Sequence, residues 1–248
     1  MTLPDVDVVI LTWNDGALLE RAVRSALDSE DVRATIVVVD NGSDPPAEVV
    51  VDPRVALVRL ESNVGVSRGR NIGVRAGTAS LVCLLDSDAV LHRRTLAVLA
   101  DAVAVSGVGL TGPVFSGQRP EDSGGAAPTL YRKVRRVLGW SASYGSTRDT
   151  RSNRWDVDFV IGACQLFRRD AYDAVGGIDE RWFYGPEDAD FCMRLREAGW
   201  RVVQCQDAAC DHPPRRRNRR LLTRRGLAHA KAVAEFLWRH RHYEGVNG

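Results

Sequence analysis

Four apolar segments in the first half of the chain each run directly into a cluster of polar residues. These segments are Val6–Leu11, Thr35–Val39, Val55–Leu60 and Leu81–Leu85. Continuous apolar runs of this length are typical of strands that are buried on both faces. The first segment is followed by apolar residues at helical spacing between Leu18 and Leu27, and helices are also predicted at 66–76 and around 95–105. Strands that alternate with helices in this way predict an α/β fold with a mostly parallel sheet.

The polar clusters indicate where such a sheet would bind a ligand. They read TWN at 12–14, DNGS at 40–43, SNVG at 62–65 and DSD at 86–88. Ligands of open parallel sheets bind at the carboxyl ends of the strands. Four clusters at four strand ends therefore predict a nucleotide pocket at this edge of the sheet.

Composition and charge exclude several classes of protein. The chain has 248 residues and a net charge of only +2, which argues against a dedicated nucleic-acid binder. The N-terminus lacks the features of a signal peptide, and no apolar run approaches the ~20 residues of a membrane span. Five scattered cysteines suggest buried thiols in a reducing compartment. We therefore expect a cytoplasmic protein. A zinc site at Cys205, Cys210 and His212 is disfavoured because no second ligand pair exists.

Asp86 and Asp88 follow the fourth apolar segment directly. Side chains two residues apart in an extended segment point the same way, and two close carboxylates repel unless a cation lies beside them. Their oxygens suit Mg2+ or Mn2+. The spacing alone leaves a solvated strand-to-helix turn as the alternative. His212, which follows a predicted strand at 200–206, becomes a candidate ligand only if Asp88 binds a metal.

Glu187 and Asp188 begin a predicted short amphipathic helix. Acidic residues in the first turn complement the helix dipole, which is sufficient to explain them. The functional alternative is a general base that takes a proton from an incoming hydroxyl group. The preceding segment 182–186, WFYGP, would supply a shaped, partly dry pocket that raises a carboxylate pKa. The pattern leaves both interpretations open.

In their order and spacing, these motifs resemble those of the inverting glycosyltransferases of family 2. The resemblance runs from about Val6 to His212 and rests on VVILTWN, VVVDNGS, NVGVSRGRNIG, LLDSDA and the long segment that begins IGACQLFRRD and ends EDADFCMRLREAGWRV. That segment and RNRRLLTRR at 217–225 resemble the rhamnosyltransferase-like branch. The family implies the GT-A fold, with a single Rossmann-like, mostly parallel central sheet flanked by helices.

The resemblance also implies a role for each matching position. On the donor side it places the residues Thr12, Asn14, Asp40, Asn63, Arg70, Asp86, Ser87 and Asp88. It makes Asp88 and His212 ligands of Mg2+ or Mn2+. It makes Asp188 the catalytic base, with Glu187 as its neighbour and the runner-up, and it places Gly162 and Trp182 on the acceptor side.

The expected protein is thus one glycosyltransferase domain over residues 1–248. A nucleotide-sugar half (1–115) and an acceptor half with a closing helix (155–248) flank a variable loop (116–154). UDP- or dTDP-sugar is the expected donor and the acceptor is unknown. Peripheral contact with the inner face of a membrane stays open, through the basic runs 215–220 and 131–140, the second of which is flanked by Tyr131 and Trp140. A homodimer also stays open. The rival predictions are a nucleotidyltransferase, a module that only binds nucleotide sugar, and an electrostatic binder that uses 215–220.

Overall fold

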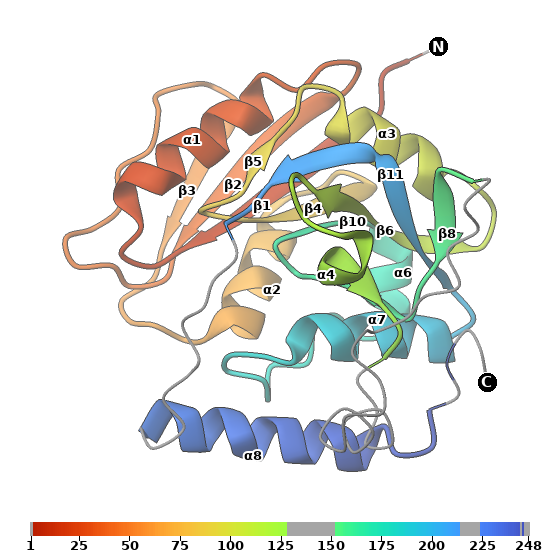
Figure 1. Cartoon of the computed structure of the whole chain (residues 1–248). Coiled ribbons are helices and arrows are strands. Elements are labelled where there is room, and N and C mark those ends of the chain that lie inside the picture. Colours follow the sequence, from red (N-terminus) through yellow and green to blue (C-terminus); the bar gives the residue numbers. More distant parts are fainter. Residues whose placement is uncertain (1, 128–151, 214–223, 244, 246–248) are drawn as a thin grey trace.

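The computed structural model describes residues 2–127, 152–213, 224–243 and 245. Nine strands form one central sheet in the order β3-β2-β1-β4-β10-β6-β11-β5, with β8 paired to β11. Helices α1 and α3 cover one face, whereas α2, α6 and α7 cover the other (Figure 1). This is the α/β arrangement that the alternating pattern predicted.

The first half of the chain alternates strands with helices almost as predicted. Its elements are β1 (Asp5–Thr12), α1 (Gly16–Leu27), β2 (Arg33–Asp40), β3 (Val55–Arg59), α2 (Val66–Ala76), β4 (Leu81–Asp86), β5 (Val90–Leu91), α3 (Thr95–Val103) and β6 (Val108–Phe115). Strands β3, β2, β1 and β4 are parallel neighbours. Thr12 lies opposite Asp40, and Leu11 lies opposite Asp86. The strand ends that carry the polar clusters therefore meet at one edge.

The second half adds antiparallel strands to the sheet. Its elements are α4 (Pro120–Ser123), β7 (Gly124–Gly125), β8 (Arg154–Asp156), β9 (Phe159–Val160), β10 (Cys164–Arg168), α6 (Arg169–Ala174), α7 (Glu187–Glu197), β11 (Arg201–Asp211) and α8 (Arg224–Arg239). Strand β10 lies antiparallel between β4 and β6, and β11 runs parallel to β6. Strands β7 and β9 form a separate pair.

Three expectations for the second half need correction or fall outside the described residues. Strand β11 continues past the predicted end at 206, through a register shift between Cys205 and Ala209, because β5 and β6 still offer partners there. The start of the variable loop forms α4 and β7 rather than an irregular segment, whereas residues 128–151 lie outside the described residues. The basic run 215–220 also lies outside them.

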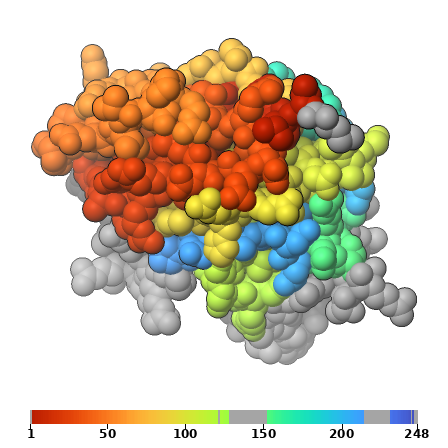
Figure 2. Space-filling view, turned by 90° about the horizontal axis from the view of Figure 1, so that it is seen from above, coloured from red at the N-terminus to blue at the C-terminus, as the bar shows by residue number. Residues whose placement is uncertain are grey.

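Apolar side chains form a core on each face of the sheet, and a smaller third cluster joins α7 to α8. This third cluster contains Trp182, Met193 and Phe236. Seen from above, the surface on the side of α1 is formed mostly by the N-terminal half of the chain. A strip of β11 lies beside β5 (Figure 2). Among the described residues, no helix combines the length and apolar character that a membrane crossing needs.

The cysteines are free and buried, as predicted; they are Cys83, Cys164, Cys192, Cys205 and Cys210. Burial raises the pKa of the Cys192 and Cys205 thiols to about 12. Within the described residues, the cluster around His212 that could hold a metal contains Asp86 and Asp88 instead of cysteines.

Candidate active site

The loops after β1, β2 and β3 are held together by hydrogen bonds between side chains and backbone. Asp40 accepts the N–H of Ser43 on Oδ1 (3.0 Å) and the N–H of Ala47 on Oδ2 (2.9 Å). Asn14 donates its backbone N–H to Ser43 Oγ (3.0 Å) and accepts the N–H of Asp44 on Oδ1 (2.9 Å). These contacts fix a polar rim at the ends of β1 and β2.

Asp40 is a buried carboxylate at this rim. Burial acts to raise its pKa, but the hydrogen bonds from Ser43 and Ala47 and the charge of Arg59 outweigh burial and lower the pKa. Nearby, the buried Thr12 hydroxyl oxygen has no hydrogen-bond partner among the described residues. Thr12 and Asp40 are therefore buried polar groups at adjacent strand ends.

Asn63 shapes the third loop of the rim. Its Oδ1 accepts the N–H of Gly65 (2.9 Å) and the side-chain amide of Asn41 (3.1 Å). Asn41 in turn accepts the N–H of Val64 on Oδ1 (2.9 Å). The structure thus adds Asn41, which sequence reasoning missed although it lies inside the DNGS cluster.

The structure brings Asp86, Asp88 and His212 together. One ligand atom of each lies within 4.8 Å of the others, and His212 Nε2 is 3.6 Å from Asp88 Oδ1. The extension of β11 carries the chain to His212, whose ring lies 5.1 Å from that of Phe115. His212 Nε2 is buried and has no hydrogen-bond partner among the described residues. Ser87 donates to Asp15 Oδ2 (3.0 Å), a contact to the start of α1.

This cluster fits a divalent cation by the chemistry of its donor atoms. Two hard carboxylates suit Mg2+ and Mn2+, and Mn2+ also accepts an imidazole nitrogen. A buried imidazole nitrogen without a hydrogen bond is costly unless another partner satisfies it. Asp88 and His212, which the resemblance selected as ligands, are therefore in a suitable arrangement.

Arg70 connects the acidic cluster to α7. Its guanidinium donates to Asp86 Oδ1 (2.8 Å), to the carbonyl of Gly162 (3.0 Å) and to Glu187 Oε1 (3.3 Å). The side chain is buried, which opposes its charge, yet Asp86 and Glu187 raise the pKa of Arg70. A permanent positive charge thus links the end of β4 to the start of α7.

Glu187 and Asp188 lie side by side at the start of α7 but in different surroundings. Burial, followed by the charge of Asp188, raises the pKa of Glu187 to about 7, although Arg70 acts to lower it. Asp188 is half-buried and accepts the N–H of Gly162 on Oδ2 (3.1 Å) and that of Ala189 on Oδ1 (2.7 Å). The two adjacent carboxylates therefore have different partners and different charge environments.

Gly162 leaves space for both of these partners. A Cβ atom at this position would lie 2.8 Å from Arg70 Nη1 and 3.1 Å from Asp188 Cβ. Its backbone carbonyl and N–H contact the same two residues. The absence of a side chain here allows Arg70 and Asp188 to approach the backbone.

In the aromatic segment before α7, Phe183 and Tyr184 are exposed, whereas Trp182, the predicted acceptor-side residue, is buried. Trp182 is 1% exposed and packs edge-on against Phe236 of α8, with 6.5 Å between the ring centroids. This burial does not support direct acceptor contact by Trp182. Phe183 and Tyr184 are 59% and 49% exposed, and the Phe183 carbonyl accepts the N–H of Val66 (2.7 Å). No sequence periodicity distinguishes these three rings.

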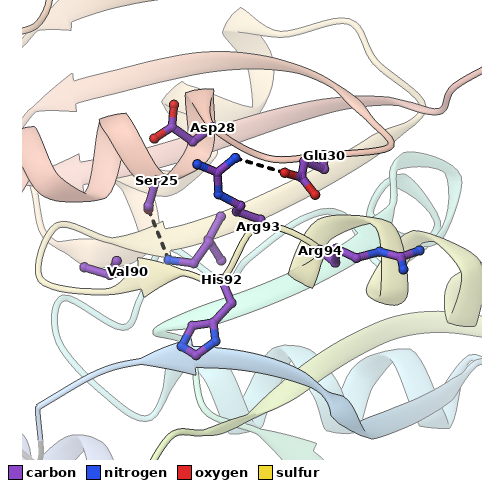
Figure 3. Close-up of a pocket in the computed structure, with 8 residues that line it drawn as sticks. Ser25, Asp28, Glu30, Val90, His92, Arg93 and Arg94 are labelled. Carbon is purple, nitrogen blue, oxygen red and sulfur yellow. Dashed lines mark hydrogen bonds and ion pairs between the residues drawn. The ribbon is translucent and has the colours of Figure 1, made fainter.

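A shallow groove of about 710 Å³ lies elsewhere, between the end of α1 and the segment after β5 (Figure 3). The Arg93 guanidinium donates to Glu30 Oε1 (2.9 Å), and the Leu91 N–H donates to Ser25 Oγ (3.1 Å). None of the predicted site residues lines this groove. The catalytic hypothesis therefore rests on the strand-end cluster instead.

The sheet is mostly parallel, and carboxylates at its strand ends lie near an acidic helix start. This arrangement is the one expected of GT-A glycosyltransferases. A family model described as "Glycosyltransferase like family 2" matches residues 4–227, and the chain belongs to this family. The protein is therefore a glycosyltransferase, which confirms the resemblance and disfavours the three rival predictions.

Two relatives from Mycobacterium tuberculosis (strain ATCC 25618 / H37Rv) are similar over most of the chain. An N-acetylglucosaminyl-diphospho-decaprenol L-rhamnosyltransferase is 31% identical over 232 residues, which cover 83% of this chain and 75% of the relative. A pre-mycofactocin glycosyltransferase is 30% identical over 206 residues, which cover 80% of this chain and 40% of the relative. The first relative is consistent with the rhamnosyltransferase-like resemblance.

Two solved structures share the fold. The mannosyltransferase PcManGT from Pyrobaculum calidifontis, in complex with GDP-Man and Mn2+, has a TM-score of 0.61 and 21% identity, over 86% of this chain and 57% of that chain. GalNAc-T7 with UDP, GalNAc and Mn2+ has a TM-score of 0.67 and 18% identity, over 86% and 44%. The chain thus spans about half the length of these two structures, which confirm the GT-A fold.

Proposed function

We propose that the protein is a metal-dependent inverting glycosyltransferase, which moves a sugar from a nucleotide diphosphate to an acceptor hydroxyl group. The observation that carries this proposal is that one guanidinium links two acidic groups. Arg70 donates to Asp86, which lies beside Asp88 and His212, and to Glu187, which lies beside Asp188. The first group suits a cation and a diphosphate. The second suits proton removal from an acceptor.

Asp88 and His212 would hold the cation, with Asp86 beside them. A bound Mg2+ or Mn2+ would stabilise the negative charge that develops on the departing diphosphate. The rim formed by Thr12, Asn14 and the loops around Asp40 and Asn63 would bind the nucleoside. Arg70 donates to Asp86, which would face the sugar, while Ser87 anchors the turn to α1 through Asp15. UDP and dTDP are the nucleotides we propose.

Asp188 is the base that we propose, and Glu187 is its neighbour. Each oxygen of Asp188 accepts one backbone N–H, which orients the carboxylate and leaves it a free lone pair. Glu187 accepts a hydrogen bond from Arg70 on Oε1. Because the pKa of Glu187 is about 7, a fraction of the molecules carries a protonated Glu187 near neutral pH. Asp188 would take the acceptor proton while the hydroxyl oxygen attacks the anomeric carbon opposite the nucleotide, with inversion.

Phe183 and Tyr184 are the acceptor-side residues that the geometry favours over Trp182. Exposed rings beside the start of α7 offer apolar faces for a sugar ring. The rhamnosyltransferase relative makes nucleotide-linked L-rhamnose the first donor to test, and a polyprenyl diphosphate that carries N-acetylglucosamine the first acceptor. Such an acceptor would bring the enzyme to a membrane surface, which the basic run 215–220 would favour. A homodimer stays a prediction.

The test is thermal unfolding with UDP, dTDP and GDP, each with and without Mn2+, on the wild type and on Asp88→Ala. A nucleotide at a hundred times its dissociation constant stabilises the fold by about 2.7 kcal/mol. This corresponds to roughly 5–10 °C for a domain of this size. We expect a metal-dependent shift for one nucleotide, lost in Asp88→Ala. The absence of any shift would refute the proposed donor site.

A further inference from the structure

Helix α8 extends beyond the segment that the family model matches. The match ends at residue 227, whereas α8 continues to Arg239 and is followed by the buried His240. Figure 1 shows α8 as the outermost helix, lying beneath α7 on the side away from the sheet. The part of the chain that contacts α7 from this side is therefore outside the shared family region.

His240 contacts the turn of α7 that carries the proposed base. Asp190, two residues after Asp188, has a fully buried side chain. Its Oδ1 lies 3.0 Å from His240 Nε2, and its Oδ2 accepts the Nε–H of Arg194 (2.8 Å). His240 Nδ1 lies 3.4 Å from Oε1 of Glu197, the last residue of α7. A single imidazole thus contacts α7 near both of its ends.

The same helix holds the aromatic segment that precedes α7. Phe236 packs against Trp182, and the His240 ring lies 4.9 Å from that of Phe236. Arg239 donates to Asp179 Oδ2 (2.9 Å), at the start of the loop that leads to Phe183 and Tyr184. Helix α8 therefore contacts the acceptor-side loop and the first turn of α7 together.

The same turn is also held by the rest of the active site. Gly162 donates to Asp188, and Arg70 donates to Glu187. The first turn of α7 is thus fixed by these contacts together with that of His240 to Asp190. A shift of the turn away from Gly162 would displace the proposed base from the acceptor.

We propose that His240 is a positioning residue for Asp188, and that it acts by holding Asp190 in the first turn of α7. This inference rests on the proposed function. Burying an imidazole against a carboxylate is a poor way to gain stability alone, because desolvation offsets much of the attraction. Such a bond contributes direction instead, since it fixes one carboxylate oxygen relative to one ring nitrogen. Misplacement of a reacting group by about 1 Å is enough to slow catalysis strongly.

The experiment compares His240→Leu with His240→Gln in the full chain. Leucine replaces part of the volume of the ring but cannot donate to Asp190, whereas the glutamine amide can replace the Nε2 donor. Tyr243→Phe is the matched control, because it removes a 3.3 Å hydrogen bond to Asp158 from the same end of the chain without touching Asp190. Three quantities are measured: amide hydrogen exchange at residues 188–191, the dissociation constant of UDP, dTDP or GDP, and turnover with nucleotide-linked L-rhamnose.

We expect His240→Leu to speed exchange at 188–191 and to lower kcat about tenfold or more. The nucleotide dissociation constant should stay within about twofold, because the donor rim lies on the other half of the chain. His240→Gln should recover most of both effects, and Tyr243→Phe should show neither. A His240→Leu protein with wild-type exchange and turnover would overturn the inference. The inference would also be overturned if His240→Gln restored neither the exchange rate nor kcat, or if Tyr243→Phe changed both as much as His240→Leu.

The exchange measurement needs no substrate, so the two proposals fail separately. A wild type that binds none of the nucleotides and transfers no sugar would refute the proposed function. Exchange at 188–191 would still decide whether His240 fixes the first turn of α7. Unchanged exchange in His240→Leu, together with normal sugar transfer, would refute the positioning role alone.

Discussion

The donor rim and the first turn of α7 satisfy their polar groups in opposite ways. At the rim, Asp40, Asn14 and Asn63 bond mainly to backbone N–H groups of nearby loops. In α7, Glu187 and Asp190 pair with side chains that come from other parts of the chain, Arg70 and His240. The rim is thus a locally closed structure, whereas the first turn of α7 depends on contacts with residues far away in the sequence.

This difference predicts unequal sensitivity to substitution. A hydrogen bond to a backbone amide contributes about 1 kcal/mol to the free energy of unfolding. Removal of one partner from a buried ion pair costs about 3–5 kcal/mol, because the remaining charge stays buried. Substitutions around α7 should therefore affect both stability and catalysis more than substitutions at the rim.

The largest expected effect is on catalysis, in Asp188→Asn. The amide retains the size of the carboxylate but cannot accept the acceptor proton, so turnover should fall by about 10²–10⁴-fold. Nucleotide binding should persist, since the donor rim and the acidic cluster are unchanged. Release of nucleoside diphosphate from the donor measures the first quantity and calorimetry measures the second. Near-normal turnover would move the base to another residue, with Glu187 first in line.

The second effect is on stability, in Arg70→Met. Loss of the guanidinium leaves Asp86, Glu187 and the Gly162 carbonyl without their shared donor. We expect a loss of about 3–5 kcal/mol in the free energy of unfolding, measured by urea titration. Arg68→Met, on the same helix, is the matched control. Arg68 is exposed and lies 3.9 Å from Glu180, so its loss should cost less than about 1 kcal/mol. Equal losses would remove the distinction between the two regions.

The third effect depends on pH and concerns Glu187→Gln. The folded-state pKa of Glu187 is raised from 4.5 to about 7, so its stabilising contribution is complete below 4.5 and is lost as pH rises through 7. The wild type should thus lose up to about 3 kcal/mol between pH 4.5 and pH 8 from this group. The glutamine variant should lack this loss, so its stability relative to the wild type should rise with pH up to about pH 8. Parallel stability curves for the two proteins would contradict the raised pKa.

The rim could be predicted from the sequence because its geometry follows from the sheet. Once β1, β2, β3 and β4 are parallel neighbours, their ends must meet, and the polar clusters follow those ends directly. The Asp86–Asp88 pair was selected in the same way. The bounds of α2 and the start of α7 also match the prediction.

The surroundings of α7 could not be predicted because they depend on long-range contacts. Arg70 and Glu187 are 117 residues apart, and Asp190 and His240 are 50 residues apart. No periodicity links such positions. The burial of Trp182 likewise depends on α8, because Phe236 of that helix packs against it from 54 residues away in the sequence. Family resemblance supplied the role of Asp188 but not the contacts that hold it.

The smallest effect should come from Asp40→Asn, which tests the rim directly. An asparagine has one acceptor oxygen, so either Ser43 or Ala47 loses its partner and faces an N–H donor instead. We expect a loss of roughly 1–2 kcal/mol by urea titration. Asp44→Asn is the control, because its backbone N–H rather than its carboxylate bonds to Asn14. If Asp40→Asn destabilised the protein as much as Arg70→Met, the rim would depend on buried charge as α7 does. Hydrogen bonds within nearby loops would then not explain why the strand-end motifs can be recognised from the sequence.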